Sequence, residues 1–137
     1  MEKGFFALFE NLNWKVSEED QEEAVAYFAD LVKCSPQSIR LVAPTVSRSC
    51  LWHNEARVIC AQDDYLLERH LHMLFNWLVD INWPGAEAIF DRLAVMDSDV
   101  VDTELQVAKD WALASGAARW YTALDELSEE RNKRTLH

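Results

Sequence analysis

Apolar residues return at intervals of three and four positions along most of the chain, which is the spacing of one face of an α-helix. Between residues 18 and 33, for example, Ala24, Phe28 and Leu31 form such a stripe. No segment shows the alternation of apolar and polar residues that is typical of a strand. The pattern predicts helices over residues 5–12, 18–33, 36–43, 50–61, 64–81, 84–93, 100–115 and 117–130. In the helix over residues 100–115, the expected buried face consists of Val101, Leu105, Ala108, Trp111 and Ala112.

Local signals mark several ends of these helices. Ser17 precedes Asp20 by three residues, which is the spacing of a capping box. Ser35 is expected to cap a short helix that has Pro36 at its first position. Gly116 suits the left-handed position after a helix C-terminus.

The expected helix over residues 64–81 has the clearest pattern. Its apolar ridge consists of Leu67, Leu71, Leu74, Leu78 and Ile81. A polar stripe, each member four residues after the last, consists of Asp64, Glu68, His72, Asn76 and Asp80. Because other apolar residues widen the ridge, we expect this helix to be central and covered on more than one side.

Two short segments resemble each other and suggest an internal repeat. Residues 11–14 read Asn-Leu-Asn-Trp and residues 80–83 read Asp-Ile-Asn-Trp, and each is followed by a new helix. Repeated helical hairpins bury a face by stacking on the next hairpin. The expected fold is therefore all-α, a HEAT-like stack of antiparallel helical hairpins with seven to eight helices. It would form one domain over residues 1–137, with a frayed tail over residues 130–137.

Composition and charge restrict the partners of the chain. It has 137 residues, with 13 Lys and Arg against 24 Asp and Glu, so its formal net charge is −11. Such a surface repels phosphate backbones, which excludes nucleic acid as the expected partner, and it attracts basic proteins. The charge is uneven, with −5 over residues 1–33, +2 over 34–62 and −8 over 63–137.

The cysteines and the apolar runs predict a cytoplasmic protein. Cys34, Cys50 and Cys60 are odd in number and form no Cys-X-X-Cys pair, which is typical of reduced thiols. The first residues lack a signal-peptide cleavage site, and no apolar run reaches the roughly 18 residues of a membrane span. We expect no membrane association.

One segment resembles the signature of a known family. Residues 74–86 read Leu-Phe-Asn-Trp-Leu-Val-Asp-Ile-Asn-Trp-Pro-Gly-Ala, similar to a bacterial family catalogued as domain of unknown function 5071. Residues 51–59, with Trp52 and Asn54, look like the preceding helix of that family, and residues 12–17 match its opening. His53 and Arg57 depart from the family's usual polar residues there.

The resemblance implies a small HEAT-like domain without known catalytic residues. Such proteins resemble the small acidic neighbours of polymorphic or contact-dependent toxins, which act as immunity proteins. A partner surface near residue 52 would differ from that of the family, because His53 and Arg57 stand there.

The signature itself has two interpretations. It contains Trp77, Asp80, Asn82, Trp83 and Pro84. An aromatic ring beside a carboxylate and an amide could form the lip of a pocket. Asx residues commonly satisfy backbone groups at helix ends, and tryptophans fill the base of a hairpin. We favour the structural interpretation.

Catalytic and metal patterns are weak. His70 and His72 are two residues apart, whereas helical zinc motifs place histidines four apart. The polar stripe over residues 64–80 could bind a metal, but such faces are usually only solvated. Cys50 and His53 could meet as a nucleophile and base, although a thiol among apolar residues is usually inert. We expect no enzyme activity, no metal and no cofactor.

The leading hypothesis is a non-enzymatic immunity protein that neutralises a cognate bacterial toxin by direct binding. Its partner would be a protein and could be a basic toxin domain; the sequence sets no oligomeric state. A HEAT-like adaptor and, less favoured, a small-ligand or metal-dependent enzyme are the alternatives. The residues expected to bind the partner are Glu19, Glu22, Glu23, Trp52, Asp63 and Asp64.

Overall fold

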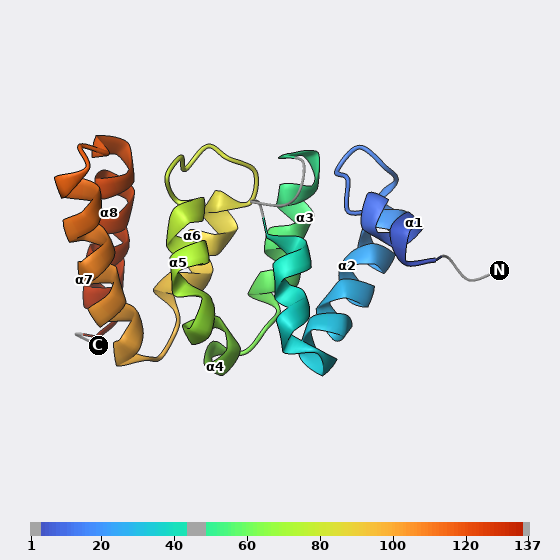
Figure 1. The fold of residues 1–137 in the computed structure, drawn as a ribbon, viewed down its shortest axis with the longest axis horizontal. Helices are drawn as coiled ribbons and strands as arrows, with labels where there is room; N and C mark the ends of the chain where they lie inside the picture. The colour runs from blue at the N-terminus through green and yellow to red at the C-terminus, as the bar shows by residue number, and fades with distance from the viewer. Residues whose placement is uncertain (1–3, 44–48, 136–137) are drawn as a thin grey trace. The chain divides into compact units, whose positions relative to one another are not determined.

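The computed structural model describes residues 4–43 and 49–135. This part of the chain contains eight α-helices, two short 3-10 helices and no strand, so the all-α prediction is confirmed (Figure 1). None of these helices combines the length and the apolar content that crossing a bilayer requires. The chain divides into two compact units, Met1–Gln62 (unit 1) and Asp63–His137 (unit 2), and each is described by itself. The HEAT-like stacking stays a prediction.

Unit 1 is built around the longest of its helices, α2. Its elements are α1 (Phe5–Glu10), α2 (Glu18–Cys34), the 3-10 helix η1 (Pro36–Val42) and α3 (Ser49–Cys60). α2 packs against α1, η1 and α3. Ser17 caps α2 as predicted, since its Oγ accepts the Asp20 N–H at 3.2 Å. Ser35 is the N-cap residue of a short helix that begins at Pro36, as predicted, but this helix is a 3-10 helix and the Ser35 side chain makes no capping hydrogen bond.

Aromatic rings join α1 to α2. The rings of Phe5 and Phe9 contact the buried ring of Phe28 edge to face, with centroids 5.5 and 5.8 Å apart. Rings in this geometry stabilise a packing contact beyond the area they bury. A helix as short as α1 is marginal in isolation, so this cluster is what fixes it on unit 1.

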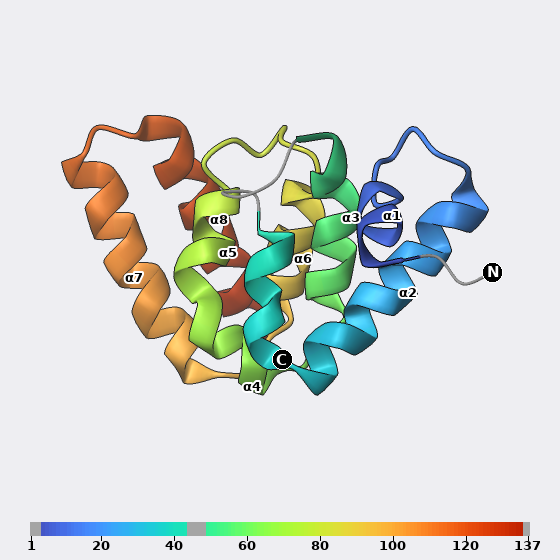
Figure 2. The same ribbon diagram turned by 45° about the vertical axis from the view of Figure 1, so that its right-hand side comes forward.

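Unit 2 contains the remaining helices. They are α4 (Asp64–Leu67), the 3-10 helix η3 (Glu68–His70), α5 (Leu71–Trp77), α6 (Ala86–Ala94), α7 (Asp99–Ala114) and α8 (Ala118–Thr135). Within unit 2, α7 and α8 form the most extensive contact, and α5 packs on α6 and α7 (Figure 2). Gly116 has a φ of 72°, and the Gly116 and Ala117 N–H groups bond to Leu113 and Ala112, so the predicted C-terminal glycine is confirmed.

The predicted single helix over residues 64–81 is wrong. Backbone angles of −127° and 26° at His70 interrupt it, and α5 ends at Trp77. Leu67, Leu71, Leu74 and Leu78 are buried as expected, whereas Ile81 lies exposed in the loop. The helical pattern extended too far because Leu78 and Val79, which fit it, lie in a turn after α5, where their N–H groups bond to Phe75 O and Asn76 O.

The prediction of a frayed tail is wrong for residues 130–135, because α8 continues to Thr135 and Arg131 is buried. Residues 136–137 lie outside the described part of the chain. The Arg131 guanidinium binds both carboxylate oxygens of Asp102, at 2.7 and 3.1 Å. Its Nη1 also donates to the carbonyls of Leu93 at 2.6 Å and Met96 at 2.9 Å, and its Nη2 donates to Ser98 O at 3.0 Å. One side chain therefore joins α8 to α7 and to the end of α6.

Replacing Arg131 with Ala should lower the free energy of unfolding by about 2–4 kcal/mol, because the carbonyls and the carboxylate that it satisfies lose their donor. Urea unfolding followed by far-ultraviolet circular dichroism measures this loss. Arg134→Ala, in the same turn but exposed, is the control and should change it by less than about 0.5 kcal/mol. Equal losses in both variants would contradict the role of Arg131.

Candidate functional site

The residues expected to bind a partner fall on both units. Glu19, Glu22 and Glu23 lie on α2 and Trp52 lies half-buried on α3, all in unit 1. Asp63 and Asp64 begin unit 2. The two groups are therefore separate candidates.

The acidic face of α2 is a set of exposed carboxylates that share one side of the helix: Glu19, Glu22, Glu23 and Asp30. Their spacing of three, four and seven residues places them on the side opposite the buried Ala24 and Phe28. The only exposed cation on this helix is Lys33, in its last turn. The acidic face therefore carries net negative charge.

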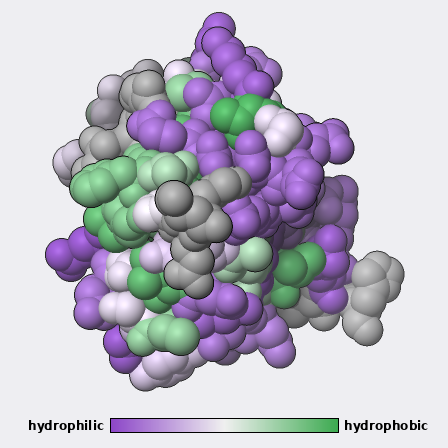
Figure 3. Space-filling view, turned by 90° about the vertical axis from the view of Figure 1, so that its right-hand side faces the viewer, coloured by the Kyte–Doolittle hydropathy of each residue, from purple (hydrophilic) through white to green (hydrophobic). Residues whose placement is uncertain are grey.

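Unit 1 also exposes two aromatic side chains, one on α1 and one on α2. Phe6 on α1 is 81% exposed and meets the ring of Phe5 edge to face at 5.4 Å. Tyr27 is 39% exposed, packs on Phe28 at 5.0 Å, and follows Glu23 by one helical turn. In Figure 3, which looks onto α1 and α2, hydrophobic surface lies beside a broad hydrophilic area. The sequence pattern singles out neither residue, because Tyr27 fits the apolar stripe of its helix and Phe6 lies in a short, mostly apolar segment.

A polar network fixes α2 to α3 beneath the acidic face. The Arg57 guanidinium donates to Glu22 Oε1 at 2.7 Å and to Asn54 Oδ1 at 3.1 Å. The buried Asn54 amide donates to Leu12 O at 2.7 Å and to Gln21 Oε1 at 2.9 Å. Glu22 therefore has a structural partner, and Arg57, which departs from the family pattern, supplies it.

Asp63 and Asp64 make contacts within unit 2. Asp63 Oδ1 accepts the Leu66 N–H at 2.9 Å and so caps α4. Asp64 pairs with Arg92 of α6 at 2.6 Å and accepts the Asp97 N–H at 3.0 Å. Burial raises the pKa of Asp64, but the Asp97 N–H and the Arg92 guanidinium lower it by more, so the pKa of Asp64 lies below its ordinary value of 3.8. Both residues therefore contribute to the fold.

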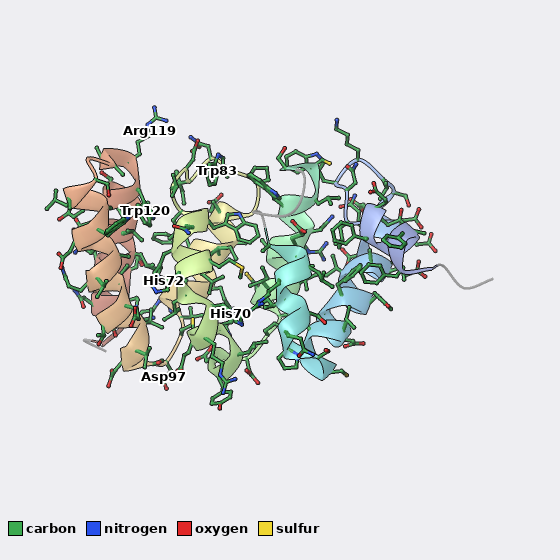
Figure 4. All side chains as sticks on the ribbon, viewed as in Figure 1. His70, His72, Trp83, Asp97, Arg119 and Trp120 are labelled. Atoms are coloured by element: carbon green, nitrogen blue, oxygen red, sulfur yellow. The ribbon has the colours of Figure 1, made fainter. Side chains whose placement is uncertain are left out.

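The signature segment forms the corner between α5 and α6. The buried indole of Trp77 donates to Pro84 O at 2.9 Å. Asp80 Oδ1 accepts the Asn82 N–H at 2.9 Å, and Asp80 O accepts the Trp83 N–H at 3.0 Å. Asn82 itself is exposed, and Trp83 is half-buried in the same loop (Figure 4). Hydrogen bonds within the corner thus stabilise its conformation.

A hollow of about 390 Å³ lies beside this corner, between the loop and the first turns of α8. Its charged lining consists of Asp80, Arg119 and Glu126. Arg119 extends away from the helices in Figure 4. The hollow is open and is lined by one cation and two carboxylates. Its lining therefore favours neither anions nor cations as ligands.

The other catalytic candidates do not converge in the described residues. His72 Nε2 lies 3.9 Å from Glu104 Oε2, and His70 occupies the 3-10 turn (Figure 4). Across residues 4–43 and 49–135, no three His, Cys, Asp or Glu side chains gather closely enough to hold a metal ion. The three cysteines, all within the described residues, form no disulfide with one another; Cys34 is exposed and Cys50 and Cys60 are half-buried.

Comparison of the chain with protein-family models, curated proteins and solved structures finds no match. The resemblance at residues 74–86 therefore stays an expectation that rests on those residues.

Asp64→Asn should reduce the pH dependence of stability. A carboxylate whose folded-state pKa is lowered stabilises the fold above its ordinary pKa, and the effect is lost as the pH falls through the folded value. The variant should therefore be less stable than wild type by about 1 kcal/mol at pH 6, and the difference should shrink below pH 4. Urea unfolding between pH 3 and 7 tests this, and Arg92→Gln should show the same trend. A difference that stays constant down to pH 3 would contradict it.

Asp80→Ala should lower the free energy of unfolding by about 0.5–1 kcal/mol, because the Asn82 N–H loses its acceptor. Asp80→Asn keeps an acceptor oxygen at the same place and is the matched control, with a loss of less than half that size. Thermal or urea unfolding measures both. If Asp80→Ala instead abolished partner binding at unchanged stability, the corner would be a binding feature.

Proposed function

We propose that this chain is a non-enzymatic protein-binding protein that neutralises a cognate toxin, as an immunity protein does. The binding surface that we propose is the acidic face of α2 together with Phe6 and Tyr27. The observation that carries the proposal is Phe6, a large apolar side chain that is 81% exposed on α1, which packs on the helix that carries the exposed carboxylates.

Each part of this surface has a different task in binding. Buried aromatic anchors contribute most of the affinity of protein interfaces, and Phe6 and Tyr27 supply two rings on a packed aromatic cluster. Carboxylates such as Glu19 and Asp30 steer a basic partner toward the surface and raise the association rate. The expected partner is a protein with an apolar pocket rimmed by Lys and Arg.

Other features agree with this proposal. The net charge of −11 disfavours nucleic acid as the ligand and favours a cationic protein. The resemblance of residues 74–86 to a bacterial family whose relatives accompany toxins points to the same class of partner. Action on such a toxin would place the chain in the cytoplasm, where its free thiols stay reduced.

Affinity capture with the tagged wild-type chain from its native cells, followed by mass spectrometry, should identify the partner. We expect a basic toxin domain whose binding weakens as salt rises. Phe6→Ser should weaken this binding by about 10-fold or more, and Glu19→Lys should slow association with a smaller effect on dissociation.

The controls change an exposed apolar residue and an exposed carboxylate outside the proposed surface. Leu41→Ser changes another exposed apolar residue of unit 1, and Glu129→Lys changes an exposed carboxylate of unit 2; both should leave the affinity within twofold. Coexpression of the wild-type chain should also protect cells from the captured toxin. A partner that is no toxin but needs Phe6 would favour an adaptor, and binding unaffected by Phe6→Ser would refute the surface.

A further inference from the structure

The outward side of α7 carries a second exposed apolar stripe. Val100, Val107 and Trp111 are exposed, and the exposed fraction of Trp111 is 68%. Together with Glu104 and Ala114 they follow one another at steps of four, three, four and three residues. Steps of four and three residues keep side chains on one line along a helix. We call these five residues the α7 stripe. The sequence pattern predicts Trp111 on the buried face of this helix, and its exposure corrects that prediction.

The α7 stripe is not part of the core of unit 2. The buried residues of α7 are Val101, Leu105, Ala108 and Ala112. They lie about 100° around the helix from the centre of the stripe, at 100° per residue. In Figures 1 and 2, α5 and α8 lie on one side of α7 only. The packing of the described part of unit 2 therefore does not account for a Trp at position 111.

The charges beside the stripe are acidic. Glu104 lies within it, and the exposed Asp110 lies one position before Trp111 and follows Val107 by three residues. Two cations of the α7–α8 pair bind carboxylates outside the stripe: Lys109 binds Asp125 at 2.9 Å and Arg131 binds Asp102 at 2.7 Å. His72 of α5 stands at the edge, 3.9 Å from Glu104.

We propose that the α7 stripe is a docking site for a cationic amphipathic helix of another protein. An apolar row with heptad spacing fits the apolar row of a partner helix, and flanking carboxylates select Lys and Arg beside that row. A second copy of this chain fits poorly, because two stripes face to face would bring Glu104 and Asp110 against the carboxylates of the other copy. This site is independent of the proposed toxin-binding surface, which lies on unit 1.

Isothermal titration of the full chain with two 18-residue synthetic peptides tests the site. One peptide carries Leu at heptad spacing with Lys elsewhere, and the other carries the same Leu residues with Gln in place of Lys. We expect the Lys peptide to bind at least 10-fold more tightly than the Gln peptide. Trp111→Ala combined with Val107→Ala should weaken the Lys peptide by about 10-fold or more.

Two further variants test whether the peptide binds at the α7 stripe and not elsewhere on the chain. Leu113→Ala changes a residue of α7 that is 66% exposed but points about 160° away from Trp111, and Phe6→Ser changes the unit 1 surface. Both should leave the peptide affinity within twofold. Equal binding of the two peptides, or affinity unchanged by Trp111→Ala with Val107→Ala, would overturn the proposal. A dimer in sedimentation experiments that Trp111→Ala dissolves would also overturn it, by making a second copy the occupant.

Discussion

Backbone carbonyls at and beyond the ends of helices need donors, and in this chain distant side chains supply many of them. The last four carbonyls of a helix have no partner within it, and glycine caps that would tighten the end are scarce in a sequence with three Gly. Asn54 donates to Leu12 O after α1, Trp120 donates to Phe75 O at 2.8 Å in α5, and Arg131 donates to the end of α6. Each donor lies 38 to 45 residues from its acceptor. The hydrogen bond that satisfies a carbonyl at or beyond the end of one helix therefore also positions the helix that carries the donor.

This arrangement divides the polar residues into two groups. Residues that face inward are engaged in the fold: Asp63 caps a helix, Asp64 holds α4 to α6, and Asn54 links α2 and α3 to the loop after α1. Residues on the outer sides of α2 and α7 contribute less to the hydrogen bonds and ion pairs that hold the helices together. Exposed aromatic and apolar side chains there are costly for a protein that only needs to fold, because they favour association. Those two faces are therefore where binding should be sought.

Local sequence signals predicted the local structure well. Six predicted helices correspond to α1, α2, α3, α6, α7 and α8. These helices, the cap at Ser17 and the glycine at position 116 depend on neighbours within a few residues, so they could be predicted from the sequence. The break at residues 68–70, the ordered end of α8 and the exposure of Trp111 could not. Arg131 orders its helix through residues 29 to 38 positions away, and Trp111 lies just outside a buried face that the packing of α5 and α8 defines. A helical pattern shows which residues share a face, but not which face receives a partner.

Counting charges in the sequence has a similar limit, because it does not show which carboxylates have a cation nearby. The acidic run over residues 18–23 and the pair at 63–64 look alike in sequence, yet within each site the carboxylates differ in whether a cation lies nearby. Asp64 faces Arg92, and Glu22 faces Arg57, so much of their field is cancelled at short range. A carboxylate steers a partner only to the extent that no nearby cation neutralises it. The long-range attraction of a basic protein should therefore come mainly from residues such as Glu19 and Asp30 on α2, and Asp110 on α7, where the outer faces also offer rings for it to bury.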